Sequence, residues 1–114
     1  MMKNTIYKIC PETAWDAAVV AGIYEGSQDD KRDGFIHFST KGQVKATLAK
    51  HFSRQAGLLL LAIDVSLLNP SELKYEDNGK GEKFPHLYGK LSLSVVQACC
   101  PIRMTAAREH IIDF

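Results

Sequence analysis

The sequence has few features typical of an exported, membrane or metal-dependent protein. Only three cysteines occur among the 114 residues, and no Cys-x-x-Cys pair is present for zinc binding or thiol–disulfide exchange. The longest apolar run, residues 58–63, is far too short to cross a bilayer. The first residues contain no apolar signal-peptide core. We therefore expect a cytoplasmic protein with reduced thiols and no membrane partner.

Neither positive nor negative charge predominates in the sequence. The formal net charge of +1 provides no long-range field that would hold a nucleic acid or an anionic membrane. The one dense charge cluster, residues 28–33, has signs that nearly cancel, which is typical of a solvated loop. Neither a glycine-rich dinucleotide fingerprint nor a P-loop occurs. The four histidines lack metal-ligand spacing, so we expect no metal site at His37, His51, His86 or His110.

The order of the predicted elements favours an α+β fold in a single domain, residues 1–114. Two helices are expected early in the chain, one after a capping box at Thr13–Asp16 that ends at Gly22, and one after a capping box at Thr40–Gln43. Several strands are expected later, so the regular alternation of a doubly wound fold is absent. The predicted strands cover residues 5–10, 34–39, 58–65, 73–76 and 95–104.

The segment 33–40 is the most informative for function. In a strand, Phe35, His37 and Ser39 share one face, so an imidazole and a hydroxyl lie together. Thr40 follows at the N-terminus of a helix, where free N–H groups favour an anion such as phosphate. The alternative is a hydrogen-bonded core histidine followed by an ordinary helix cap.

A second polar segment, residues 84–89, is predicted to be an irregular loop, because it contains Pro85 and ends at Gly89. Its His86 and Tyr88 are expected to share a pocket with His37, unless the loop only covers the core. Glu76 is the candidate carboxylate that would orient an imidazole or act as a base, unless it is simply solvated.

Several segments together resemble a known family. They are residues 6–9, Trp15, 22–27, 33–40, 43–44, 51–52, 73–76 and 84–89. The chain resembles domain-of-unknown-function family 952, a group of small bacterial proteins. The resemblance covers nearly the whole sequence.

This resemblance implies an ADP-ribosyltransferase-like fold, in which two small, mainly antiparallel or mixed sheets form a cleft that holds NAD. In that superfamily an early strand supplies a histidine and often a hydroxyl residue, which His37 and Ser39 match by position. The sequence departs from the pattern of a catalytic glutamate on a late strand. Glu76 precedes the 84–89 segment, and Glu109 lies in the tail. The arginines of the related RNA 2′-phosphotransferases also have no clear equivalent, and a shared fold does not supply a shared function.

The leading hypothesis is a cleft centred on His37 that binds a nucleotide-like ligand such as NAD or ADP-ribose, with NAD as a candidate substrate. The reaction, if the chain is an enzyme, would be ADP-ribosyl or phosphoryl transfer. The alternatives are a non-catalytic small-ligand or protein-interaction module, and a structural protein with His37 in its core. The candidate catalytic residues are His37, Glu76 and His86. The candidate ligand-binding residues are Tyr24, Ser27, Gly34, Phe35, Ser39, Thr40, Phe84 and Tyr88.

Overall fold

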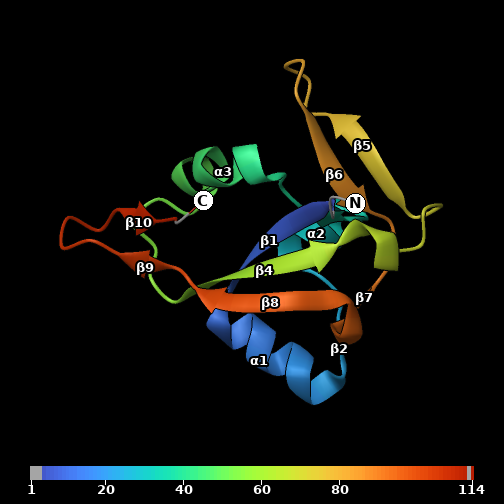
Figure 1. The fold of residues 1–114 in the computed structure, drawn as a ribbon, viewed down its shortest axis with the longest axis horizontal. Coiled ribbons are helices and arrows are strands. Elements are labelled where there is room, and N and C mark those ends of the chain that lie inside the picture. The colour runs from blue at the N-terminus through green and yellow to red at the C-terminus, as the bar shows by residue number, and fades with distance from the viewer. Residues whose placement is uncertain (1–3, 113) are drawn as a thin grey trace.

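The computed structural model describes residues 4–112 and residue 114 (Figure 1). The main sheet is antiparallel and has the strand order β1-β4-β8. These strands are β1 (Thr5–Pro11), β4 (Leu58–Asp64) and β8 (Val96–Pro101). The prediction of a central apolar strand at β4 is confirmed, because Leu61 and Ile63 in it have no exposed surface.

A second antiparallel sheet has the order β3-β6-β5. It consists of β3 (Ile36–His37), β6 (Lys83–Leu87) and β5 (Leu73–Asp77). The prediction of an irregular loop at residues 84–89 was wrong, since most of this segment lies in β6. Pro85 fits a strand here because its backbone oxygen accepts a hydrogen bond from the Phe38 N–H at 2.9 Å, a bond that needs no donor from proline.

Two further antiparallel pairs are short. β2 (Ile23–Tyr24) pairs with β7 (Leu91–Ser92), and β9 (Arg103–Met104) pairs with β10 (His110–Ile111). Single turns of 3₁₀-helix occur at Lys41–Gln43, Val65–Leu67 and Leu93–Val95. The chain is therefore a small α+β protein with several small antiparallel sheets.

The helix α1 (Glu12–Ala21) ends at Gly22 as predicted. Gly22 has a φ of 82°, and its N–H donates to the oxygen of Ala18 at 2.8 Å. The predicted capping box was wrong, because the helix begins directly after Pro11. The N–H of Glu12 already donates to the oxygen of Gly57 at 2.8 Å, so the neighbouring chain satisfies part of the first turn.

The helix α2 (Gln28–Asp33) replaces the solvated loop expected for the charge cluster. Ser27 begins it with a capping box: the Ser27 Oγ accepts from the Asp30 N–H at 3.1 Å, and Asp30 Oδ2 accepts from the Ser27 N–H at 2.9 Å. Asp30 is only 2% exposed. The cluster is thus a short helix with one buried carboxylate.

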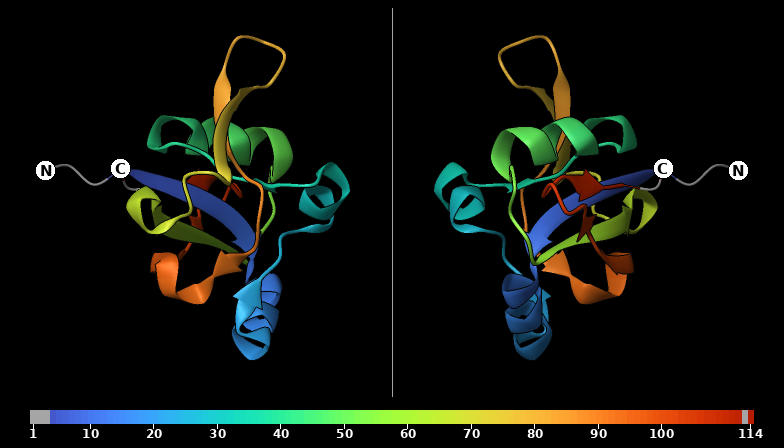
Figure 2. Two further views of the ribbon diagram at one scale, coloured as in Figure 1. Left: turned by 90° about the vertical axis from the view of Figure 1, so that its right-hand side faces the viewer. Right: turned by 90° about the vertical axis from the view of Figure 1, so that its left-hand side faces the viewer.

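The helix α3 (Val44–His51) follows the predicted capping box, in which Gln43 Oε1 accepts from the Thr40 N–H at 3.0 Å. Val44 and Leu48 pack with Ile9, Leu58 and Ile102 on one face of the main sheet. α1 lies on the opposite side (Figures 1 and 2). No helix within residues 4–112 is long and apolar enough to span a membrane.

Candidate functional site

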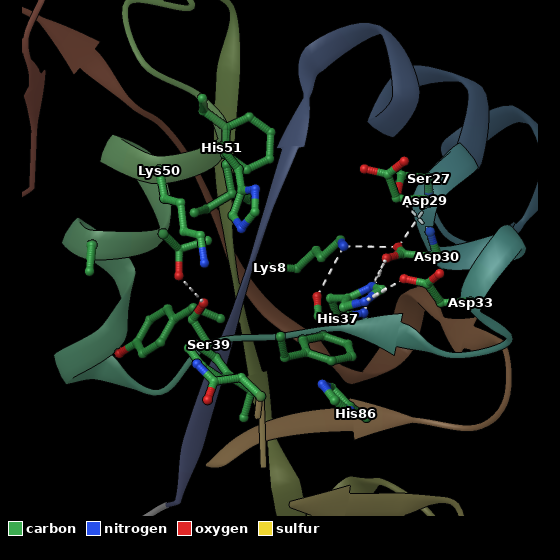
Figure 3. Close-up of a pocket in the computed structure, with 18 of the residues that line it drawn as sticks. Lys8, Ser27, Asp29, Asp30, Asp33, His37, Ser39, Lys50, His51 and His86 are labelled. Carbon is green, nitrogen blue, oxygen red and sulfur yellow. Dashed lines mark hydrogen bonds and ion pairs between the residues drawn. The ribbon is translucent and has the colours of Figure 1, made fainter. Parts of the chain in front are cut away.

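A cavity of about 330 Å³ opens between α3, β1, α2 and the paired strands β3 and β6 (Figure 3). Charged groups, hydroxyls and imidazoles line it together with aromatic rings. The polar side chains that matter most for its chemistry are Lys8, Asp30, His37, Ser39, His51 and His86. Segments distant in sequence therefore meet at one polar hollow.

Asp30 is the centre of a buried charge network. Its Oδ2 contacts the Lys8 Nζ at 2.8 Å, and its Oδ1 lies 2.6 Å from the His37 Nδ1. The His37 backbone N–H donates to the same Oδ1 at 3.2 Å. The Lys8 Nζ also donates to the backbone oxygen of His37 at 3.0 Å. The network ties β1, α2 and β3 together at the wall of the cavity.

The electrostatic environment favours an ionised Asp30. Burial alone would raise the pKa of this carboxyl. The hydrogen bond from His37, together with the charge and hydrogen bond of Lys8, outweighs burial and places the pKa of Asp30 well below its usual range. Asp30 is therefore a permanent acceptor at neutral pH.

The His37 ring is held between two carboxylates. Its Nδ1 lies at 2.6 Å from Asp30, and its Nε2 lies 3.1 Å from the Asp33 Oδ2. The pKa of Asp33 is also lowered, first by the hydrogen bond from Arg32 and further by the proximity of His37. An ionised carboxylate only accepts hydrogen bonds, so both contacts are hydrogen bonds only when both ring nitrogens carry protons. The two carboxylates therefore fix the orientation of the His37 ring.

His37 and His86 are directly opposite each other on β3 and β6. Their ring centroids are 5.4 Å apart in an edge-on arrangement. Phe35 stacks on the His86 ring with the centroids at 4.1 Å and contacts the His37 ring at 4.6 Å. The phenyl ring thus fixes the relative positions of the two imidazoles.

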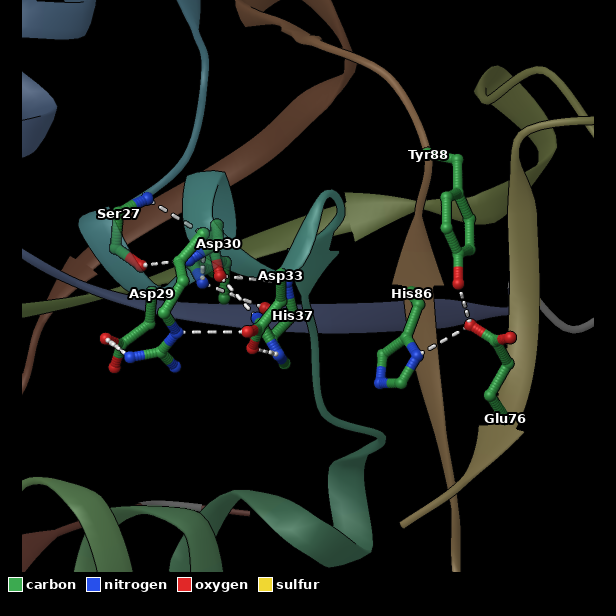
Figure 4. Close-up of polar contacts among 10 residues, drawn as sticks. Ser27, Asp29, Asp30, Asp33, His37, Glu76, His86 and Tyr88 are labelled. Carbon is green, nitrogen blue, oxygen red and sulfur yellow. Dashed lines mark hydrogen bonds and ion pairs between the residues drawn. The ribbon is translucent and has the colours of Figure 1, made fainter.

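His86 has a carboxylate partner of its own (Figure 4). The Glu76 Oε1 lies 2.9 Å from the His86 Nδ1 and accepts from the Tyr88 hydroxyl at 2.5 Å. The hydrogen bonds from Tyr88 and His86 lower the pKa of Glu76. The hydrogen bond between Tyr88 and Glu76 raises the pKa of Tyr88. In the described chain, no partner contacts the Nε2 of His86, which leaves this nitrogen for a ligand.

The comparisons with other proteins now identify the family. The profile of the family described as "Protein of unknown function (DUF952)" matches residues 9–99. The chain belongs to the DUF952 family. No curated protein matches it significantly.

Solved structures similar to this DUF952 chain come from protein CC0527 of Caulobacter crescentus. The crystal structure has 41% sequence identity and a TM-score of 0.88, and the match covers 94% of this chain and 93% of that chain. The solution NMR structure has 43% identity and a TM-score of 0.81, with 90% and 88% covered. The similarity extends over nearly the whole fold.

The DUF952 structure brings some of the predicted site residues to the cavity and leaves others outside its lining. Ser27, His37, Ser39, Phe84 and His86 line it. Ser39 is buried, and its Oγ lies 3.1 Å from the Thr47 Oγ1. The residues outside the lining are Tyr24, Gly34, Phe35, Thr40, Glu76 and Tyr88.

The predicted residues outside the lining support the imidazoles, end or cap helices, or pack in the core. Phe35, Glu76 and Tyr88 lie behind the imidazoles and support them. Gly34 ends α2, and Thr40 caps the turn before α3. Tyr24 is 3% exposed and packs in the hydrophobic core, and its hydroxyl has no hydrogen-bond partner in the described part of the chain.

Three charged residues of the site were not predicted from the sequence: Lys8, Asp30 and Asp33. The signal for Lys8 was its place two residues from Ile6 and two from Cys10, on the buried face of β1. The signal for Asp30 was the spacing Ser27-x-x-Asp30, a capping-box pattern that also predicts a helix.

Proposed function

We propose that this DUF952 protein binds a small nucleotide-like ligand, such as NAD or ADP-ribose, in the cavity beside His37 and His86. One observation carries the proposal: imidazoles at opposed positions on paired strands border a single cavity, each fixed by its own carboxylate. Such fixed donors and acceptors are suited to ribose hydroxyls and phosphate oxygens. The hydroxyls of Ser39 and Thr47 and the amino group of Lys50 add to the polar lining.

The size of the cavity suggests which part of the ligand is enclosed. Its volume of about 330 Å³ lies near the lower end of the roughly 300–1,000 Å³ typical of small-molecule sites. This is room for about half of a dinucleotide. Phe52 and Phe84, both partly buried, supply apolar walls for a base or a nicotinamide ring. The other half of NAD would extend into solvent.

The proposal includes transfer of an ADP-ribosyl or a phosphoryl group. His86 would act as the acid–base residue, because Glu76 orients its Nδ1 and its Nε2 is left for substrate. The carboxylates of Asp29 and Asp33, which line the cavity, would stabilise positive charge as nicotinamide leaves. The ADP-ribosyltransferase-like fold that the family resemblance implies is part of this proposal. A structural superposition on an enzyme of that superfamily tests it.

Calorimetry with NAD, ADP-ribose and a 2′-phosphorylated RNA tests the binding. The wild type is expected to bind at least one of them, and His86→Ala is expected to weaken that binding about tenfold or more. Gln97→Ala is the control, because Gln97 is exposed on β8 and lines neither this cavity nor the second hollow of the structure. Absence of heat from every ligand with the wild type removes the proposal. Glu76→Gln separates catalysis from binding: nicotinamide release should slow while affinity changes little.

A non-catalytic ligand-binding module is the second candidate, and the geometry of His37 favours it. Both nitrogens of this ring already contact carboxylates, which suits a structural support better than a proton acceptor. This candidate predicts no nicotinamide release under any condition. It also predicts a defined small ligand retained on purification, which native mass spectrometry detects.

A further inference from the structure

Acidic residues are unevenly distributed along the chain, although the net charge is nearly zero. Residues 34–63 contain no aspartate or glutamate, and residues 83–108 contain none either. The first stretch carries Lys41, Lys45, Lys50 and Arg54. The acidic residues are concentrated in residues 12–33 and 64–82. A net charge near zero is therefore compatible with a locally basic surface.

The fold gathers part of this basic sequence around a second hollow, of about 360 Å³. The hollow lies between α3, the turn after it and the β9–β10 hairpin, which is seen beside the end of α3 in Figure 1. Among the residues that the structure describes, its charged lining comprises Lys45, Arg54 and Arg108 together with the carboxylate of Glu109. His110 lies there as well. We call this hollow, with Lys45, Arg54 and Arg108 in its lining, the basic hollow.

Backbone oxygens hold the two arginines of the basic hollow in place. The Arg108 Nη2 donates to the backbone oxygen of Arg54 at 2.9 Å, and the Arg54 Nη1 donates to the oxygen of Ala107 at 3.4 Å. Both arginines and Lys45 are exposed, and none of them forms an ion pair with any residue of the described chain. Positioned arginines without a carboxylate partner are suited to bind phosphate oxygens.

We propose that the basic hollow binds the sugar–phosphate backbone of a single-stranded nucleic acid. The two hollows flank the same helix, since α3 supplies Lys45 to this one and Lys50 to the histidine cavity. A helix with its side chains is about 10 Å across, so a ligand that reaches cations on both sides must be extended. The aromatic rings of Phe52 and Phe84 in the cavity provide stacking surfaces for a base, which together with a cationic track is the usual design for single strands.

The cations of this site lie outside the cavity lining, so their binding of phosphates stands without the ligand proposed in the cavity, although a base stacked on Phe52 or Phe84 would compete with that ligand. Fluorescence anisotropy with labelled RNA and DNA single strands of about 12 nucleotides tests it across a range of salt concentrations. Arg54→Ala/Arg108→Ala is expected to weaken binding about tenfold or more. It should also reduce the slope of log K against log salt by roughly 0.7 for each phosphate that the protein no longer neutralises. Comparison of the RNA and DNA arms identifies the preferred strand.

Two further variants keep the test decisive. Lys45→Ala removes a cation that makes no hydrogen bond within the described residues, so its loss of affinity cannot come from a misfolded loop. Lys31→Ala/Lys90→Ala removes two exposed charges elsewhere and should leave binding unchanged. The inference is overturned if the wild type shows no salt-dependent binding, or if the control double variant weakens it equally. Equally tight binding of inorganic pyrophosphate or of a polyglutamate peptide also overturns it.

Discussion

Replacing Asp30 by asparagine is the most direct test of the buried charge network. The change keeps the size of the side chain and removes its charge. Lys8, whose side chain is 8% exposed, would then keep a buried ammonium group with only neutral acceptors, one of them the His37 oxygen at 3.0 Å. Leaving one partner of a buried ion pair uncompensated costs about 3–5 kcal/mol. We expect Asp30→Asn to lower the free energy of unfolding in urea by that amount, out of a total of about 5–15 kcal/mol.

The opposite substitution should cost less. In Lys8→Met the carboxylate of Asp30 keeps the hydrogen bonds from the His37 ring, the His37 N–H and the Ser27 N–H. We therefore expect a loss of about 1–3 kcal/mol. The double variant Lys8→Met/Asp30→Asn should lose less than the sum of the two single losses, because the residues are in direct contact. It also shows whether the chain still folds if Asp30→Asn alone does not.

Asp29→Asn is the matched control, since the Asp29 carboxylate is 75% exposed and should contribute less than about 1 kcal/mol. The pH dependence gives a second readout. The folded pKa of Asp30 is below its unfolded value, so its stabilisation is present above about pH 4 and is lost as the pH falls through the folded pKa. Asp30→Asn should lack this acid dependence. A loss no greater than that of Asp29→Asn refutes the network as described.

Three other predictions concern single positions. Gly26→Ala should destabilise the fold by about 1–3 kcal/mol, because φ is 102° and the new Cβ would lie 2.7 Å from the Asp30 Cβ. Urea denaturation should show a smaller loss for Gly79→Ala, which has a φ of 87° but meets open space. Gln43→Ala should cost about 1–3 kcal/mol, because the Gln43 Nε2 donates to the Lys83 oxygen at 2.7 Å and its Oε1 caps Thr40. Gln97→Ala, at an exposed position, should be nearly neutral, and equal midpoints for the two glutamine variants would contradict the role of Gln43. Burial raises the pKa of Cys10 to about 11, so a thiol reagent at pH 8 should titrate Cys99 and Cys100 in the folded protein, whereas Cys10 should react only after denaturation. Three rapidly reacting thiols would show that the β1 interior is open.

Elements fixed by local chemistry could be predicted from the sequence. The uninterrupted apolar run of β4 indicates burial on both faces wherever the strand lies in a sheet. Gly22 ends α1 because a left-handed conformation is inexpensive only for glycine. The Thr40–Gln43 cap needs only residues that are neighbours in the chain. For Gly22 and for the Thr40–Gln43 cap, the stabilising contact lies within a few residues of the signal, whereas for β4 the signal is the apolar run itself.

Elements that depend on distant partners were missed. Pro85 and Gly89 favour a loop by local preference, but β6 pairs with β3 on one side and β5 on the other, and this pairing overrides the preference. Asp30 is buried because Lys8, 22 residues earlier, compensates its charge. From the sequence, the charges of residues 28–33 cancel among themselves, and the Ser27-x-x-Asp30 spacing indicates a helix cap but not that its carboxylate is buried against Lys8.

The two imidazoles differ in how many ring nitrogens contact a carboxylate: one in His86 and two in His37. Hydrogen bonds from Tyr88 and His86 lower the pKa of Glu76, so this carboxylate only accepts, and the Nδ1 of His86 must be the donor. In a neutral ring, the remaining nitrogen of His86 then has a free lone pair. Both nitrogens of His37 already contact carboxylates, at 2.6 Å from Asp30 and 3.1 Å from Asp33, so this ring has no nitrogen left for a substrate. Within the proposed function, a substrate group that must lose a proton would therefore be placed against His86, and His37 would hold the neighbouring wall of the cavity in place.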